Sequence, residues 1–193
     1  MSELVALYKK HKHTTDKHGT HSYLPVYDKL FKRLKDNKNR ILEIGIYRGD
    51  SLNLWAEYFT NSIIFGVDNN IAQAYSNLNS RVHTIRVNNA YNDFTLNLLK
   101  NIGKFDIIID DGSHNVKDQK FVISNYCDLL TDDGILIIED VQIALEGRYS
   151  VNDINNLLNC FPNGLKKYVY YDDRRNIANT VNDILIICDK GKL

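Results

Sequence analysis

Residues 105–114 read FDIIIDDGSH, and residues 134–140 read GILIIED. Each segment is a continuous apolar run that ends in acidic side chains. A run that is apolar on both faces is typical of a central strand in a parallel sheet whose two faces are covered by helices. These segments therefore predict two central strands, over Phe105–Ile109 and Gly134–Ile138.

Apolar β-type runs alternate with helical periodicity along most of the chain. Further strands are predicted over residues 40–46, 62–67, 81–87, 165–171 and 184–188, and helices over about 22–36, 51–59, 71–78, 93–99 and 115–130. This alternation predicts an α/β domain on a doubly wound, mostly parallel sheet of seven strands. The last two strands have no long helix between them, which predicts an antiparallel hairpin at the sheet edge.

The length of 193 residues predicts one domain, and Lys plus Arg equals Asp plus Glu at 24 each. Balanced charge argues against a non-specific nucleic-acid or membrane-surface binder, which depends on excess positive charge. No apolar run approaches the roughly 18 residues of a membrane span. We see no signal-peptide pattern, and the cysteines form neither a zinc pattern nor a redox pair, so we expect a cytoplasmic protein.

The turn after the first predicted strand, EIGIYRGD at residues 43–50, is a candidate ligand-binding turn. Gly45 and Gly49 allow a tight turn and a close approach of the backbone to a ligand. Glu43 could bind the ammonium end of an amino-acid-like ligand, and Ser51 follows at the start of the next helix. Tyr47 replaces the second glycine of the dinucleotide fingerprint, which disfavours NAD. The alternative is a plain strand-to-helix turn.

The ends of the next strands add candidates for a nucleoside contact. Asp68 ends the second strand, where an acidic residue binds the ribose hydroxyls of an adenosine. The alternative for Asp68 is a helix N-cap. Asn88 and Asn89 follow the third strand and could contact the adenine edge, although Asn is also ordinary in turns. Asp110, at the end of the fourth strand, belongs to the same predicted cofactor site.

The fourth and fifth strands end in four carboxylates, those of Asp110, Asp111, Glu139 and Asp140. Neighbouring parallel strands lie about 4.8 Å apart, so these side chains should converge. Neither motif contains Lys or Arg, so the acids repel one another unless a cation is bound or some are protonated. Oxygen ligands suit Mg²⁺ or another divalent ion, and His114 would lie beside it as a base. The alternative is a set of solvated loop caps.

Three segments, ILEIGIYRGDSLNLW, FDIIIDDGSH and GILIIEDVQ, resemble the metal-dependent sugar O-methyltransferases of macrolide and aromatic-polyketide biosynthesis. The resemblance implies the three-layer, Rossmann-like fold of class I methyltransferases, with S-adenosylmethionine and Mg²⁺ (or Mn²⁺) as cofactors. It implies metal ligands at Asp111, Glu139 and Asp140, with His114 as general base beside Asp111. Glu43, Gly45 and Asp68 would hold S-adenosylmethionine.

The segment DKHGTHSY at residues 16–23 also resembles the stretch before the first long helix of that family. The resemblance implies that residues 1–37 form a helical lid over a core of residues 38–193, with His18, His21 and Tyr23 facing the substrate. We expect a mobile polar lid. A separate histidine metal site is the alternative, because four histidines cluster between residues 11 and 21.

The expected function is methyl transfer from S-adenosylmethionine to the hydroxyl of a nucleotide-sugar, glycoside or glycan. Three other functions stay open. They are a catechol-type small-molecule O-methyltransferase, an NAD-linked oxidoreductase, and a non-catalytic subunit of a glycan-assembly complex. We expect a sugar substrate as partner, no nucleic acid and no membrane span, with a homo-oligomer left open.

Overall fold

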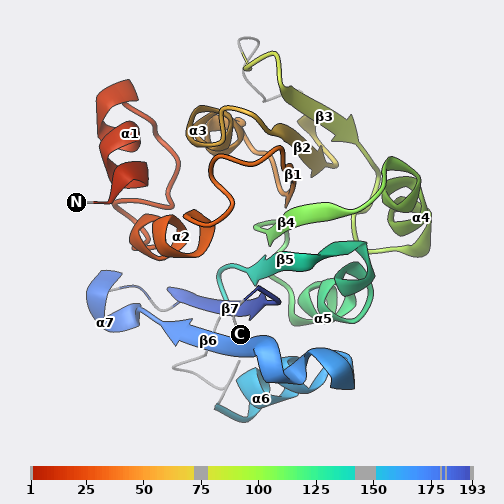
Figure 1. Cartoon of the computed structure of the whole chain (residues 1–193). Helices are drawn as coiled ribbons and strands as arrows, with labels where there is room; N and C mark the ends of the chain where they lie inside the picture. The colour runs from red at the N-terminus through yellow and green to blue at the C-terminus, as the bar shows by residue number, and fades with distance from the viewer. Residues whose placement is uncertain (1, 72–77, 142–150, 179, 181, 192–193) are drawn as a thin grey trace.

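The computed structural model describes residues 2–71, 78–141, 151–178, 180 and 182–191. A seven-stranded sheet forms the middle layer, in the order β3-β2-β1-β4-β5-β7-β6. Strands β1 to β5 are parallel, whereas β7 runs antiparallel to both β5 and β6. Helices α1, α2 and α3 cover one face of the sheet, and α4, α5 and α6 cover the other (Figure 1). The fold therefore has three layers.

The strands are β1 Arg40–Ile44, β2 Ile63–Asp68, β3 Val82–Arg86, β4 Phe105–Asp110, β5 Leu130–Ile138, β6 Val169–Asp173 and β7 Ile184–Asp189. The helices are α1 Glu3–His11, α2 Leu24–Phe31, α3 Asp50–Tyr58, α4 Asp93–Ile102, α5 Val116–Asn125, α6 Val151–Asn159 and α7 Arg175–Ala178. Two 3₁₀ helices, η2 Tyr126–Leu129 and η3 Asn163–Tyr168, precede β5 and β6.

The sheet separates two apolar cores, which explains why its central strands are apolar on both faces. One core packs α1, α2 and α3 against the sheet around Trp55 and Phe31, both fully buried. The other packs α4, α5 and α6 around Leu99 and Ile123. Burying a side chain of this size stabilises the fold by about 1.5–3 kcal/mol. Two well-filled cores hold the strand ends in a fixed position.

All seven predicted strands are confirmed, and the C-terminal pair is antiparallel as expected. The last strand, β7, lies between β5 and β6 in the sheet, so the hairpin adds to the edge with its second strand inward. The predicted helix 22–36 is shorter, because α2 ends at Phe31 and turns follow it. Helix α1 was not predicted, and the predicted helix 71–78 lies almost wholly outside the described residues.

The neighbouring pair β1 and β4 forms the switch point of the sheet. From β1 the chain proceeds to β2 on one side, whereas β4 continues to β5 on the other. Ile44 at the end of β1 pairs with both Val67 and Asp110, and Asp110 pairs in turn with Ile138. Ligands bind in open α/β sheets at this point, beyond the carboxyl ends of the strands. The predicted site residues follow these strand ends.

Candidate active site

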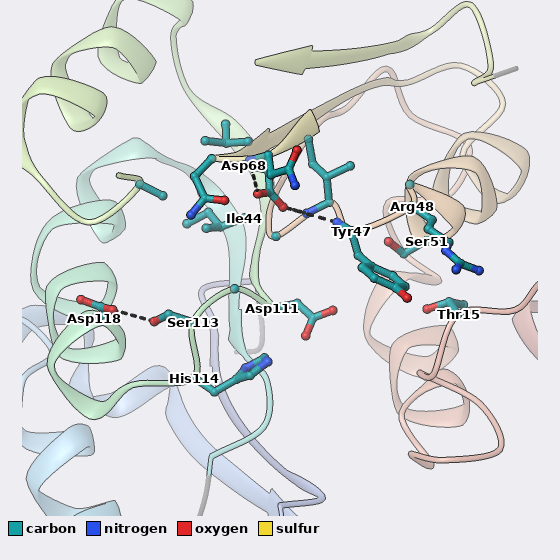
Figure 2. Close-up of a pocket in the computed structure, with 18 of the residues that line it drawn as sticks. Thr15, Ile44, Tyr47, Arg48, Ser51, Asp68, Asp111, Ser113, His114 and Asp118 are labelled. Carbon is teal, nitrogen blue, oxygen red and sulfur yellow. Dashed lines mark hydrogen bonds between the residues drawn. The ribbon is translucent and has the colours of Figure 1, made fainter. Parts of the chain in front are cut away.

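A cavity of about 970 Å³ lies at the carboxyl ends of β1, β2 and β4. Its walls include the turn after β1, the end of β2, residues 88–91 and the loop 111–114. Thr14 and Thr15, which sequence analysis did not single out, and Asp16, the first residue of the DKHGTHSY segment, close one side. Figure 2 shows Tyr47, Asp111 and His114 pointing into this shared space. A cavity of this size accommodates a nucleoside-sized ligand together with part of a second substrate.

The turn after β1 is held in shape by Asp68. Its Oδ2 accepts hydrogen bonds from the backbone N–H groups of Ile46 (2.7 Å) and Tyr47 (3.3 Å) (Figure 2). Gly45 has φ +93°, and a Cβ at this position would lie 2.1 Å from the Asp111 carbonyl oxygen. Only glycine therefore fits between the ends of β1 and β4. Asp68, Gly45 and Tyr47 all line the cavity, as do Gly49 and Ser51.

Tyr47 lies on the wall of the cavity in an unusual backbone conformation. Its φ is +45°, and its side chain is 67% exposed although the ring is large and apolar. The guanidinium of Arg48 lies over the ring, 5.3 Å from its centre. A left-handed conformation at a non-glycine residue costs free energy and is concentrated at functional sites. The geometry agrees with a ligand contact by Tyr47, which stays a prediction.

Glu43 lies beneath the cavity rather than on its wall. Its carboxylate is fully buried and accepts a hydrogen bond of 2.6 Å from Nε1 of Trp55. The other oxygen lies 3.3 Å from Nζ of Lys17. Burial raises the pKa of Glu43, and the charge of Lys17 opposes this rise. A direct contact of Glu43 with a cofactor stays a prediction, and in this structure its carboxylate faces Lys17 and Trp55.

Asp110 does not line the cavity but contacts Tyr91, which does. It is buried, and the hydroxyl of Tyr91, which lines the cavity, donates to its Oδ1 at 3.1 Å. Burial raises the pKa of Asp110 to about 7. The Tyr91 oxygen also accepts from the backbone N–H of Ser113 at 2.8 Å, which links Asp110 to the loop 111–114. Asn89 lines the cavity, and its side chain accepts from the backbone N–H of Tyr91.

Three side chains could hold a metal ion together. One ligand atom each from Asp111, His114 and Asp140 lies within 4.8 Å of the other two. The closest approach of His114 to Asp140 joins Nε2 to Oδ2 at 3.9 Å. His114 and Asp140 have φ values of +56° and +52°, so both strand ends use strained backbone to turn these side chains together. Two carboxylates and an imidazole suit a divalent ion.

The third predicted metal ligand, Glu139, is not a member of this group. Its carboxylate accepts from Nζ of Lys17 at 2.8 and 2.9 Å and from the hydroxyl of Tyr27 at 2.5 Å. Lys17 also lies 2.5 Å from Oδ2 of Asp111. The acids thus have a cation supplied by the chain itself, which sequence analysis missed because Lys17 lies outside both acidic motifs. Coordination of a metal by Glu139 stays a prediction.

The N-terminal segment differs from the mobile polar lid that we expected. Tyr23 is fully buried and donates to Oδ1 of Asp140 at 2.7 Å, and His21 stacks on the Tyr23 ring. His21 lies 3.1 Å from Asp183 and 3.5 Å from Asp140. His21 and Tyr23 therefore hold a predicted metal ligand from behind instead of lining the cavity. His18 packs edge-on against Tyr8 of α1, away from these acids.

His13 fastens the cavity wall at residues 14–16 to helix α3. Its buried ring lies between two carboxylates, with Nδ1 at 3.0 Å from Asp50 and Nε2 at 3.1 Å from Glu57. The other oxygen of Asp50 accepts from the backbone N–H groups of Thr14 and Thr15. Burial lowers the pKa of His13, but hydrogen bonds and charges from the two acids outweigh it, so the pKa is raised above 6.5.

We expect this arrangement to make stability depend on pH. Because the folded-state pKa of His13 is raised, its stabilising effect should be complete below about pH 6.5 and lost as pH rises through the raised value. Urea denaturation at pH 5 to 9 should show this loss in the native protein. His13→Gln should flatten that part of the profile, whereas His83→Gln, at an exposed position, should not. Identical profiles for the native protein and His13→Gln would exclude this role for His13.

The family described as a methyltransferase domain matches residues 42–141, from β1 to just beyond β5. This match spans more than half of the chain and contains most of the candidate site. The chain belongs to the methyltransferase domain family. The ends of β1, β2 and β4, which lie inside the matched range, share one cavity in this chain.

Two curated relatives are sugar O-methyltransferases. The chain is 32% identical over 149 residues to 8-demethyl-8-alpha-L-rhamnosyl tetracenomycin-C 2'-O-methyltransferase of Streptomyces olivaceus, covering 72% of this chain and 39% of that protein. It is 30% identical over 152 residues to mycinamicin VI 2''-O-methyltransferase of Micromonospora griseorubida, covering 75% of this chain and 36% of that protein. The chain thus spans well under half the length of these relatives.

A solved structure confirms the fold class. The chain superimposes with a TM-score of 0.74 on MycE methyltransferase from the mycinamycin pathway, solved in complex with Mg, SAH and mycinamycin VI. The sequences are 22% identical, and the match covers 98% of this chain and 54% of MycE. The prediction of a class I methyltransferase fold is therefore confirmed. Within the described part of this methyltransferase chain, no helix combines the length and apolarity needed to cross a membrane.

Proposed function

We propose that this chain is an S-adenosylmethionine- and Mg²⁺-dependent methyltransferase that acts on a sugar hydroxyl. The observation that carries the proposal is that Asp111 and His114, whose ligand atoms lie within 4.8 Å of each other and of one from Asp140, line the same cavity as Asp68. A cofactor held by Asp68 and the glycine turn would extend towards the side chains that could hold an ion. Relatives that methylate sugars support this choice of acceptor.

The residues present fit both cofactors. The close approach at Gly45, the Asp68 carboxylate and the 970 Å³ cavity suit an adenosine-containing ligand. Asp111 and Asp140 offer hard oxygen ligands, and His114 lies beside them as the base. When bound, a divalent ion lowers the pKa of an adjacent hydroxyl and orients it for attack. Tyr23 and His21 would hold Asp140 in position for this ion.

The chain's own residues would then perform binding, orientation and proton transfer. In the reaction the hydroxyl oxygen attacks the methyl carbon, the carbon–sulfur bond breaks and the electron pair stays on sulfur. His114, which is partly exposed in the cavity, would take the hydroxyl proton at Nε2. Tyr47 and the 14–16 segment would exclude water from this end of the cavity. No covalent enzyme intermediate is needed.

Ligand titrations distinguish the remaining functions. Isothermal titration should show binding of S-adenosylmethionine and S-adenosylhomocysteine but not of NADH, and binding of NADH alone would favour the oxidoreductase. Methyl transfer should then be assayed with Mg²⁺ on glycosides bearing a vicinal diol and on catechols. Turnover of catechols alone would overturn the sugar acceptor. Cofactor binding with no turnover of either class would favour a non-catalytic subunit.

We expect Asp68→Ala to weaken binding of S-adenosylhomocysteine by about 10- to 150-fold, or roughly 1.5–3 kcal/mol. The substitution removes the predicted ribose contact and also the acceptor that fixes the turn at Ile46 and Tyr47. Asp68→Asn is the matched control, since its carbonyl oxygen can still accept from one of these N–H groups. Unchanged affinity in Asp68→Ala, measured by titration calorimetry, would remove Asp68 from the site.

The proposed function also implies a partner and a cellular location for the enzyme. We propose a sugar-bearing small molecule or glycan as the partner, and a cytoplasmic location in keeping with three free cysteines. A homo-oligomer stays open, and light scattering of the purified protein would settle the subunit number. Nucleic acid is not expected as substrate, because the net charge of the chain is zero.

A further inference from the structure

Lys17 is a lysine whose charged end is wholly buried. Its side chain is 0% exposed, and Nζ lies 2.5 Å from Asp111, 2.8 Å from Glu139 and 3.3 Å from Glu43. These three acids come from three different strand ends, those of β1, β4 and β5. An ammonium in such a place is retained only if it is paired and hydrogen-bonded, because burying a lone charge is costly. Lys17 meets this condition.

The acids around Lys17 differ in how many of their carboxylate oxygens are occupied by partners within the protein. Both carboxylate oxygens of Glu139 accept hydrogen bonds from Lys17, and one of them also accepts from the hydroxyl of Tyr27. The carboxylate of Glu43 contacts Lys17 and Trp55. Asp111, by contrast, gives Lys17 only its Oδ2 and is partly exposed in the cavity. The other groups that could hold an ion, Asp140 and His114, lack a contact with Lys17 among those resolved in the described residues.

Charge counting supports a shared role for Lys17 and an external cation. One ammonium among three carboxylates leaves a surplus of two negative charges, and Asp140 adds to it. With Asp140 counted the surplus is three negative charges, and a divalent ion beside Asp111, His114 and Asp140 would offset two of them without displacing Lys17. Three carboxylates within 3.3 Å of Nζ stabilise the charged form of the ammonium.

We propose that Lys17 is a positioning residue that serves as the built-in cation of the site. It neutralises the buried Glu43 and Glu139 and fixes one oxygen of Asp111, so that Asp111 and Asp140 are left for a divalent ion beside His114. The availability of Asp111 and Asp140 for an ion rests on the proposed metal-dependent function. The neutralisation of Glu43 and Glu139 by Lys17 concerns the protein without metal. The two parts are tested separately.

The first test measures stability in EDTA. Lys17→Met keeps the apolar stem but leaves three carboxylates without their cation, and we expect the melting temperature to fall by about 10 °C. The double variant Lys17→Met/Glu139→Gln removes one negative charge as well and should recover at least half of the loss. Lys29→Met, on the exposed side of α2, is the matched control and should melt like the native protein.

The double variant keeps this test decisive if Lys17→Met does not fold. A folded double variant beside an unfolded single variant would support the proposal. A double variant that melts no higher than the single variant, or that also fails to fold, would overturn it. A native-like melting temperature of Lys17→Met would overturn it too, because the acids would then not need this cation.

The second test asks whether Lys17 stays in place when an ion binds. Lysine acylation mapped by mass spectrometry should modify Lys29 but leave Lys17 unreacted, both in EDTA and in excess Mg²⁺. Modification of Lys17 only with Mg²⁺ would show that the ion displaces it and would overturn the shared arrangement. Titration of the native protein with Mn²⁺ provides the separate control. Absence of binding would overturn the metal-dependent function but leave the EDTA result standing.

Discussion

Asp111→Asn and Asp140→Asn should each abolish nearly all methyl transfer while leaving the protein folded and able to bind S-adenosylhomocysteine. Both carboxylates belong to the group whose ligand atoms lie within 4.8 Å of one another. An amide carbonyl is a weaker ligand than a carboxylate and carries no charge to offset that of the ion. Chelation by EDTA should have the same effect on the native enzyme, and Mg²⁺ should restore its activity. We expect a loss of at least about 10³-fold in kcat, typical of removing a cation that stabilises developing charge.

Glu139→Gln provides the informative comparison. If Glu139 is a ligand, as the family resemblance implies, its variant should need as much extra Mg²⁺ as Asp111→Asn. If Glu139 serves only to hold Lys17, the variant should keep the Mg²⁺ dependence of the native enzyme and lose thermal stability instead. Full turnover of the native enzyme in excess chelator would contradict the metal mechanism in either case.

The positions of the strands along the chain were predictable, because local sequence patterns determine which segments form strands. The runs FDIIID and ILII are apolar on both faces, and in the structure they are the buried strands β4 and β5. The convergence of acids at their ends followed from the spacing of parallel strands. The pairing of β7 between β5 and β6 was beyond such patterns, because the sequence of a hairpin does not show which strand joins the existing sheet.

The partners of the acids could not be predicted from the motifs. Lys17 is 94 residues from Asp111 and 122 from Glu139, and its contacts exist only because the N-terminal segment packs against the ends of β4 and β5. One signal was available, since four acids without a nearby cation predicted that a cation must be present. The motif analysis assigned that role to a metal, whereas the structure adds Lys17. The polar composition of residues 16–23 suggested a mobile lid, yet Lys17, His21 and Tyr23 are buried, because acidic side chains far along the chain pair with them.

His114→Ala should lower kcat by about 10²- to 10⁴-fold, or roughly 3–5 kcal/mol of barrier, the usual effect of removing a general base. His114 lines the cavity in a left-handed backbone conformation, and a ring nitrogen lies within 4.8 Å of carboxylate oxygens of Asp111 and Asp140. The variant should bind S-adenosylhomocysteine as the native enzyme does.

The same ring could instead be a metal ligand, since Nε2 lies 3.9 Å from Asp140 Oδ2 within the candidate metal group. Mn²⁺ titration of His114→Ala separates the two roles. A base leaves the affinity for the ion almost unchanged, whereas loss of a ligand lowers it together with the rate, and the rate then recovers at high metal concentration. His114→Gln completes the comparison, because its amide can accept a hydrogen bond but cannot take up a proton near neutral pH. If His114→Gln turns over within a few-fold of the native rate, the base is another group.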